Sequence, residues 1–229
     1  MFRGRDALFT RAKTCSRAWF FEGRQISIRA QLRGSKGIAW DASAKVVLPI
    51  SIGQSYHEGS KLDATLNLVA RRFSSCDILV ADTLQRFNAH SEGSYSKTLH
   101  EGNEWIARNQ EAIDKYGDVF KVIRWDECTS HPWFMCEYNK LLQSATSDRE
   151  FSTILEADIA RVIGKYPDIP KENIKSYLLE ELAVFCSFFI DHHYAFVIYP
   201  GSPPHLFHML QLSSCKMPKV FGVKFIINK

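Results

Sequence analysis

The chain has 229 residues, of which 45% are hydrophobic and 24% charged, and its formal net charge is +4. This length suits one α/β domain or two small ones, and the hydrophobic content is sufficient for a full core. The apolar stretches are too short to span a bilayer, and no apolar run with a small-residue cleavage site follows the N-terminus, so we expect neither a membrane protein nor a secreted one.

Strands and helices are predicted to alternate along the chain. Short runs that are rich in β-branched residues, or that alternate polar and apolar residues, predict strands, whereas apolar residues at helical spacing predict helices. In chain order the predicted elements are a strand at Arg24–Gln31, a loop at Gly34–Ser43, a strand at Val46–Ile50, a helix at Gly59–Phe73, a strand at Cys76–Ala81, a loop at Ser91–Ser96, a helix at Lys97–Tyr116, a strand at Val119–Trp125, helices at Trp133–Ser144, Phe151–Lys165 and Glu172–Ile190, a strand at Tyr194–Tyr199, a helix at His205–Leu212 and a strand at Val220–Ile227.

This alternation predicts a single Rossmann-like α/β domain, with a mostly parallel sheet flanked by helices. In such sheets ligands bind beyond the carboxyl ends of the strands. Ser51 follows one predicted strand end, Asp82 follows another, and Tyr199 stands at a third. We therefore expect residues that are distant in sequence to meet at this edge.

Positive charge is concentrated near the N-terminus. Between residues 1 and 36, nine basic residues are opposed by Asp6 and Glu22 alone; the basic residues are Arg3, Arg5, Arg11, Lys13, Arg17, Arg24, Arg29, Arg33 and Lys36. Such asymmetry suggests a polyanionic partner such as nucleic acid, although a solvated arm has the same composition. We accordingly divide the chain into a basic N-terminal segment at 1–36, part of it flexible, and a catalytic domain at 37–229.

The cysteines and histidines give no sign of a metal site. The six cysteines form no CxxC pair, which is typical of a reducing cytoplasm and predicts neither a disulfide framework nor a zinc site. The pairs His205-x-x-His208 and His192-His193 are ligands by type, but no cysteine or carboxylate cluster accompanies them in the sequence, so we expect no metal. Met1 to Phe21 is Arg-rich and weakly resembles a mitochondrial presequence, yet we favour a cytoplasmic location.

Besides Tyr199 at its strand end, two segments carry candidate chemistry. Ser51 follows a buried strand, and Gly53 allows backbone N–H groups to approach a bound carbonyl. Tyr177 and Glu181 are four residues apart and share one face of an apolar helix, where a half-buried acid needs a partner such as a substrate ammonium group. An ordinary turn serine and a surface Tyr–Glu pair remain the alternative interpretations.

Other enzyme classes find less support. The GxSxG elbow of α/β-hydrolases is only half present, because Pro49 replaces its first glycine, and no histidine stands in a recognisable order with an acid. There is no GxGxxG sequence and no Walker loop, so a nucleotide cofactor has no support in the sequence. A serine esterase therefore stays only as an alternative.

In combination, these segments resemble the tRNA-dependent cyclodipeptide synthases. The stretch from Pro49 to Tyr56, followed by Glu58-Gly59-x-Lys61-Leu62, is similar to the nucleophile segment of that family. Residues 77–88 are similar to its second strand and the turn after it, and residues 102–109 to its next helix. Tyr177-x-x-x-Glu181 and Tyr199-Pro200 match the remaining catalytic positions. The resemblance covers residues 46–200.

One of the two groups in this family is identified by a Tyr-Pro pair at the last two of three diagnostic positions. Here those positions are Gln54, Tyr199 and Pro200, so the chain resembles that group. Pro49 stands where many members have glycine. The resemblance implies a fold like the catalytic domain of class I aminoacyl-tRNA synthetases. It also implies that no ATP and no other cofactor is used, because the amino acids arrive activated as tRNA esters.

The implied reaction forms a cyclic dipeptide by ping-pong acyl transfer through aminoacyl- and dipeptidyl-Ser51. The resemblance assigns Glu181 and Tyr177 to the ammonium group, Tyr199 to the serine or the developing oxyanion, and Tyr177 or Glu181 to proton relay. The substrate-binding candidates are Pro49, Gly53, Gln54, Leu79, Ala81, Val197 and Pro200, with Val47 beside them.

Aminoacyl-tRNA is the implied partner, and we expect a monomer. The helix at Lys97–Tyr116 carries few basic residues, and acidic residues offset them. We therefore expect Arg71, Arg72, Arg86 and Arg108, with the N-terminal arginines, to contact tRNA phosphates. A non-catalytic tRNA-binding protein of the same fold is the other alternative. The sequence does not indicate which amino acids are joined.

Overall fold

The computed structural model describes residues 20–21, 24–25, 27–33, 41–88, 94–201, 203–213 and 217–228. The predicted loop at 34–43 and most of the basic N-terminal segment lie largely outside these residues, as do Cys15 and Cys215. Two short strands, β1 (Phe20–Phe21) and β2 (Arg24–Gln25), pair with each other in antiparallel fashion.

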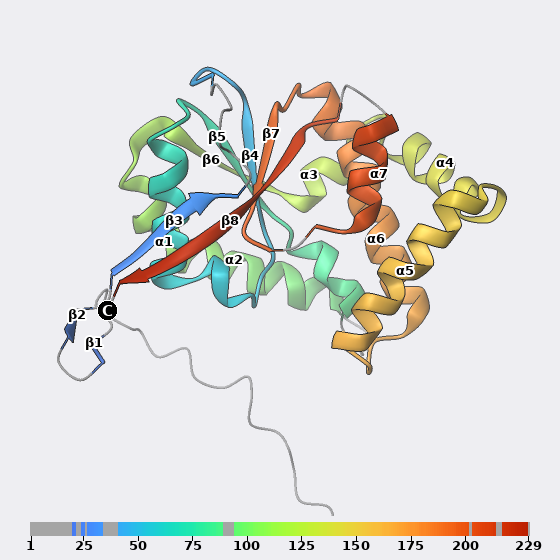
Figure 1. Cartoon of the computed structure of the whole chain (residues 1–229), viewed down its shortest axis with the longest axis horizontal. Coiled ribbons are helices and arrows are strands. Elements are labelled where there is room, and N and C mark those ends of the chain that lie inside the picture. Colours follow the sequence, from blue (N-terminus) through green and yellow to red (C-terminus); the bar gives the residue numbers. More distant parts are fainter. Residues whose placement is uncertain are drawn as a thin grey trace, which may run out of the picture.

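The centre of the fold is a six-stranded sheet with the order β3-β8-β7-β4-β5-β6 (Figure 1). Its strands are β3 (Ser27–Leu32), β4 (Val46–Ile50), β5 (Cys76–Val80), β6 (Phe120–Arg124), β7 (Phe196–Tyr199) and β8 (Lys219–Asn228). Neighbouring strands are parallel except for β3, which pairs antiparallel with β8 at one edge. The predicted mostly parallel sheet is therefore confirmed. Strand β3 lies within the segment that we assigned to the basic N-terminus.

Helices cover both faces of the sheet. Their bounds are α1 (Gly59–Ala70), α2 (Ser94–Asp114), α3 (Trp125–Thr129), α4 (Phe134–Ser147), α5 (Arg149–Lys165), α6 (Lys171–Val184) and α7 (His205–Ser213). Short 3₁₀ helices lie at Ser55–His57 (η1), Thr83–Asn88 (η2) and Gly117–Val119 (η3), and a π-helix lies at Phe185–Phe189 (η4). Among the described residues, no helix has the length and apolar character needed to cross a membrane.

Alternate residues of the central strands enter two separate cores. Val46, Leu48 and Ile50 of β4 have no exposed surface and pack with residues of α1 and α2. Val47, on the opposite face, packs with residues of α4, α5, α6 and α7. This two-sided burial explains the continuous apolar run in β4, since a parallel strand covered on both faces has no polar side. The backbone at the carboxyl end of β4 is thereby fixed.

Three differences from the predicted elements concern local geometry. Helix α2 begins at Ser94, inside the stretch that we predicted as a loop, and Trp125 begins the short helix α3 where a strand end was predicted. The helix predicted at Glu172–Ile190 is α6 followed by the π-helix η4. Such π-helical turns are frequent at functional sites and have no clear sequence signature.

Candidate active site

Ser51 begins a tight turn directly after β4. The N–H of Gln54 donates to the Ser51 carbonyl at 3.3 Å, which closes the turn. Gly53, the third residue, has φ +83°, in the left-handed region that favours glycine. The N–H of Ala81 donates to the carbonyl of Ile50 at 2.9 Å, so β5 holds the residue before the serine. The turn therefore presents Ser51 at the carboxyl edge of the sheet.

His57 holds this turn by a hydrogen bond to its backbone. Its Nδ1 atom accepts the Ser51 backbone N–H at 2.8 Å, and its side chain is fully buried. Burial lowers the pKa of His57 to about 4, so the ring is neutral and carries its proton on Nε2. Among the described residues Nε2 has no hydrogen-bond partner. His57 therefore binds the Ser51 backbone, and the described residues form no Ser-His-acid triad around it.

Tyr199, the last residue of β7, reaches the serine side chain. Its hydroxyl lies 3.2 Å from Ser51 Oγ and 3.3 Å from the hydroxyl of Tyr56. The rings of Tyr56 and Tyr199 meet edge to face, with their centroids 6.2 Å apart. A Cβ at Gly201 would lie 2.5 Å from Cε1 of Tyr199, so this position has room only for glycine. The Tyr199 hydroxyl thus lies between the hydroxyls of Ser51 and Tyr56, and Gly201 leaves room for its ring.

Helix α6 contributes Tyr177 and Glu181 to the same place. Tyr177 lies within side-chain hydrogen-bonding reach of Ser51 and Gln85. Burial, followed by the nearby Glu181 carboxyl, raises the pKa of Tyr177 well above its ordinary value. Burial also raises the pKa of Tyr199, with Tyr177 as the next contribution. Both phenols are therefore neutral hydrogen-bond donors at physiological pH.

Glu181 is the acid of the site, and it lacks a partner. Its side chain is partly buried, and no residue in the described part of the chain gives its carboxyl a hydrogen bond or an ion pair. Burial, with a smaller contribution from the charge of Asp158, raises the pKa of Glu181 to about 8. A cationic group beside this carboxyl would favour its ionised form. The site therefore offers an unpaired acid to a positively charged ligand.

Two buried ion pairs support the edge around these residues. Arg124 donates from Nε and Nη2 to the fully buried Asp82, with Nε 2.7 Å from Oδ2. A Cβ at Gly102 would come within 2.5 Å of Asp82 Oδ2, so the pair requires glycine in α2. Arg86 binds both carboxylate oxygens of Glu180. The indole N–H of Trp125 donates to Glu180 at 2.8 Å, which fixes the residue beside Glu181.

The predicted substrate-binding residues divide into two groups. Pro49, Gly53, Gln54 and Pro200 lie at or next to the turn and the end of β7, and each is exposed or partly exposed. Leu79, Ala81 and Val197 are buried in the core between the sheet and α6, together with Val47. Their exposed fractions do not exceed 4%. The second group therefore lies behind the sheet edge that carries Ser51, and its part in an aminoacyl pocket stays a prediction.

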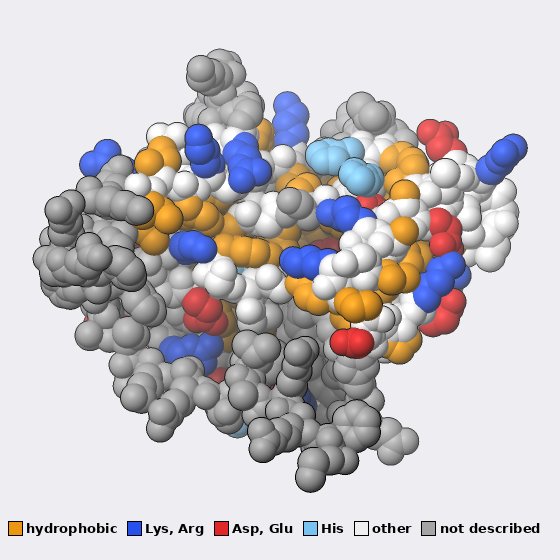
Figure 2. All heavy atoms as spheres, turned by 60° about the horizontal axis from the view of Figure 1, so that its bottom comes forward, with side chains coloured by type: hydrophobic (Ala, Val, Ile, Leu, Met, Phe, Trp, Pro, Cys, Tyr) orange, Lys and Arg blue, Asp and Glu red, His pale blue; other side chains and the backbone are white. Residues whose placement is uncertain are grey.

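The predicted tRNA-binding arginines differ in how far their charges are already neutralised. Arg86 is held by Glu180, and Arg108 lies 3.0 Å from Glu58. Arg71 is exposed at the end of α1, next to Arg72, and no carboxylate of the described residues pairs with either. Figure 2 shows basic side chains spread across one face among hydrophobic ones, without a single dense patch. Contact with tRNA stays a prediction for all four.

Sequence reasoning missed three residues that the structure brings to the site. Tyr56 stands within the motif around Ser51, but its proximity to Tyr199 depends on how β4 and β7 pair. His57 accepts the backbone N–H of Ser51, and the side chain of Gln85 lies within reach of the Tyr177 hydroxyl. The sequence offered one sign of the His57 contact, namely that His57 stands six residues after Ser51. This spacing indicates a hydrogen bond from the Ser51 N–H to the ring only when the conformation of the turn is known.

No protein-family model matches the chain, and no curated protein does either. Solved structures do match. A cyclodipeptide synthase from Fluoribacter dumoffii superposes with a TM-score of 0.80 at 22% identity, over 89% of this chain and all of that one. A Mycobacterium tuberculosis structure superposes with a TM-score of 0.65 at 16% identity, over 94% of this chain and 99% of that one, and is described as demonstrating that cyclodipeptide synthetases are related to type I tRNA synthetases.

A tyrosyl-tRNA synthetase from Archaeoglobus fulgidus, complexed with L-tyrosine, also matches. Its TM-score is 0.53 at 11% identity, over 80% of this chain and 55% of that one. The predicted fold class is therefore confirmed: the chain is an α/β domain with the fold of solved cyclodipeptide synthases, similar to the catalytic domain of class I aminoacyl-tRNA synthetases.

Proposed function

We propose that this protein is a cyclodipeptide synthase, an aminoacyltransferase that joins the amino acids of two aminoacyl-tRNAs. The observation that carries the proposal is the meeting of Ser51, Tyr199, Tyr177 and Glu181 at one sheet edge, within the fold of solved cyclodipeptide synthases. These residues come from a turn, a strand end and a helix. A serine, two neutral phenols and an unpaired acid supply a nucleophile, hydrogen-bond donors and a site for an ammonium group.

In the first step Ser51 Oγ attacks the carbonyl carbon of an aminoacyl ester. The bond from that carbon to the ribose oxygen of tRNA breaks, and the proton that leaves Ser51 ends on this oxygen. Tyr199, 3.2 Å from Oγ, is placed to donate to the developing negative charge or to hold the serine in line. The product is aminoacyl-Ser51, whose α-amino group faces Glu181 and Tyr177.

In the second step the amine of aminoacyl-Ser51 attacks the ester carbonyl of a second aminoacyl-tRNA. The second tRNA leaves, and a dipeptidyl-Ser51 remains. The new terminal amine then attacks the Ser51 ester, which closes the six-membered ring and returns the proton to Ser51. Each attack needs an amine that has lost a proton.

Glu181 is better suited than Tyr177 to take that proton. The pKa of Glu181 is raised to about 8, while that of Tyr177 is raised well above its already high ordinary value. An α-amino group has an ordinary pKa of about 7.7–8.0. A bound ammonium group lowers the pKa of Glu181 from this value, but the pKa of Tyr177 lies much further from that of the amine, because burial and the Glu181 carboxyl raise it. We therefore assign the base role to Glu181 and a hydrogen-bonding role to Tyr177.

The alternatives predict different chemistry. A serine esterase needs a histidine at Ser51 Oγ, but the ring of His57 is bound to the Ser51 backbone and has no acid partner among the described residues. A non-catalytic tRNA-binding protein has no need for Glu181, because an unpaired acid in a partly buried site disfavours contact with phosphate. Both observations favour the synthase.

Mass spectrometry of culture medium from bacteria that express the chain tests the proposal. Ser51→Ala removes the nucleophile, and Ser55→Ala, an exposed serine four residues later, is the matched control. We expect cyclic dipeptides from the parent and from Ser55→Ala, and none from Ser51→Ala. Product from Ser51→Ala would refute the serine mechanism. A folded parent that binds tRNA in a host supplying all aminoacyl-tRNAs, but forms no product, would favour the binding protein, and tRNA-independent ester hydrolysis would favour the esterase.

A further inference from the structure

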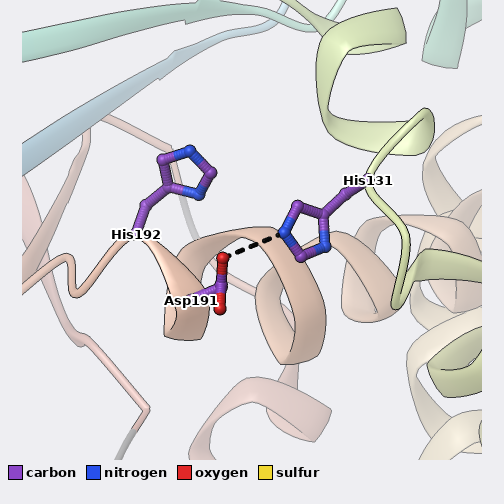
Figure 3. Close-up of side chains that lie close together, drawn as sticks. All are labelled: His131, Asp191 and His192. Atoms are coloured by element: carbon purple, nitrogen blue, oxygen red, sulfur yellow. Dashed lines mark hydrogen bonds and ion pairs between the residues drawn. The ribbon is translucent and has the colours of Figure 1, made fainter.

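A second cluster of chemically active side chains lies away from the serine edge. His131, in the connection between α3 and α4, meets Asp191 and His192, which follow the π-helix η4 (Figure 3). One ligand atom from each of the three residues lies within 4.8 Å of the others. His131 Nε2 is 3.2 Å from Asp191 Oδ2, across 60 positions of sequence. Two imidazoles and a carboxylate thus converge from two segments.

The surrounding contacts orient both rings. Nδ1 of His131 accepts the Trp133 N–H at a long 3.4 Å, so His131 donates from Nε2 to Asp191 and must give up this proton to bind a metal ion. Nδ1 of His192 lies 2.9 Å from the carbonyl of Phe188, to which it donates, so Nε2 carries a free lone pair. Its ring stacks on Phe188 with the centroids 3.9 Å apart. The side chain of His131 is only 9% exposed, and its ring lies 5.9 Å from that of His192. Metal-binding histidines commonly donate their second ring nitrogen to a backbone carbonyl in this manner.

The backbone beside the cluster is unusual. The π-helical turn η4 ends just before Asp191, and His193 has φ +55°, the only positive φ among the described residues other than glycine. Conformations of this kind cost energy and tend to persist where a site requires them. The π-helical turn and His193 flank Asp191 and His192 on either side. The cluster therefore lies in a segment whose backbone conformation is typical of functional sites.

We propose that His131, Asp191 and His192 form a binding site for a first-row divalent metal ion, with Zn²⁺ as its representative. Two nitrogen donors and one oxygen donor suit zinc and its neighbours, whereas Mg²⁺ and Ca²⁺ prefer all-oxygen sites. Donors at about 2.0–2.2 Å from a tetrahedral ion lie roughly 3.3–3.6 Å apart, so side-chain movements of about 1 Å complete the site. The fourth position is left to water.

This inference departs from our expectation that the protein binds no metal. The expectation considered His192-His193 by itself, because nothing in the sequence links that pair to His131. The ion would tie the α3–α4 connection to the end of the helix that carries Tyr177 and Glu181. Its expected effect is on stability, and it does not depend on the proposed acyl transfer.

Zinc binding by the untagged full chain tests the site. Protein stripped with a chelator is titrated with ZnCl2 against a chromophoric competitor, and its thermal unfolding is measured with and without zinc. Asp191→Asn removes a ligand at a position that is 59% exposed, so the fold should tolerate the change. His192→Gln removes a second ligand. His193→Asn and His208→Gln are controls, because each removes an exposed histidine outside the cluster. Asparagine is chosen at position 193 because it tolerates a positive φ.

We expect one equivalent of zinc and a rise of Tm in the parent and in both controls. Asp191→Asn and His192→Gln should each weaken binding about tenfold or more and abolish the rise in Tm. Absence of binding in the stripped parent would overturn the proposal, as would equal affinity in the parent and Asp191→Asn. Loss of binding in His208→Gln would place the ion elsewhere and would also overturn it. The Tm values of the metal-free variants show whether each one is folded.

Discussion

Gly201→Ala should disable the site while adding only one methyl group. The new Cβ would lie 2.5 Å from Cε1 and 2.9 Å from Cζ of Tyr199, and 2.9 Å from the hydroxyl oxygen of Tyr56. Ordinary van der Waals contact begins at 3.4 Å, so the Tyr199 ring must move away. Gly201 does not have a positive φ, so the effect is a collision and not a change in backbone preference.

The geometry sets the size of the effect. Restoring contact at Cε1 requires a shift of about 0.9 Å, from the difference between 2.5 and 3.4 Å. The hydroxyl of Tyr199 starts 3.2 Å from Ser51 Oγ, already near the limit of a hydrogen bond, so a displacement of this size disrupts the contact. Misplacement of a catalytic group by about 1 Å costs on the order of 10²-fold in rate. Losing one oxyanion donor costs about 10²–10³-fold, so Tyr199→Phe should be similarly impaired.

The assay is cyclic dipeptide formation by purified protein from aminoacyl-tRNA, beside urea unfolding of each variant. Gly164→Ala is the matched control, because a Cβ at this position in α5 meets nothing within 4 Å. We expect Gly164→Ala to keep full activity and to gain up to about 1 kcal/mol of stability from helix propensity. Gly201→Ala with activity equal to that of the parent would refute the assigned position of Tyr199.

Three further predictions concern charge, the turn and tRNA. Because the pKa of Glu181 is raised to about 8, its contribution to folding is present below about pH 4.5 and is lost as pH rises through about 8. The stability of Glu181→Gln relative to the parent should therefore increase between pH 5 and 9, by at most a few kcal/mol at about 1.4 kcal/mol per pH unit. A constant difference in urea unfolding over that range would contradict this. His57→Leu leaves the partly buried Ser51 N–H without its acceptor and should lower the free energy of unfolding by about 1–3 kcal/mol. His57→Asn should recover part of this loss in the same unfolding assay, and equal losses in the two variants would show that the hydrogen bond is unimportant. Replacing Arg71 and Arg72 by Gln should weaken tRNA binding and reduce the slope of log K against log salt concentration by roughly one per lost phosphate contact, whereas Arg149→Gln should change neither. Unchanged binding and an unchanged slope in the double variant would exclude Arg71 and Arg72 from the contact.

The strands and their burial could be predicted from the sequence because each carries a simple pattern. Val46–Ile50 is apolar on both faces, and this predicts a central parallel strand with its correct bounds. Strand ends then imply a shared edge, which is why the sequence alone places Ser51 and Tyr199 together. The π-helix η4 and the early start of α2 have no such pattern, because a single shifted hydrogen bond or a local turn decides them.

The supporting contacts of the site could not be predicted. Arg86 and Glu180 are 94 positions apart, and either residue alone has the composition of a solvated charge. We expected Arg86 to face phosphate, while the structure shows its guanidinium bound to Glu180. Which charges pair depends on the packing of η2 against α6, a property of the assembled fold. The proximity of His131 and Asp191, 60 positions apart, also depends on the assembled fold and could not be predicted from the sequence.

The central claim is that Ser51 carries the amino acid as an ester. Intact-protein mass spectrometry of the purified chain, quenched in acid after mixing with one aminoacyl-tRNA at a time, tests it most directly. The account predicts a mass increase equal to one aminoacyl group, located by peptide mapping to Ser51 and absent from Ser51→Ala. An unmodified Ser51 under conditions in which cyclic dipeptide accumulates, or an adduct that persists in Ser51→Ala, would contradict it.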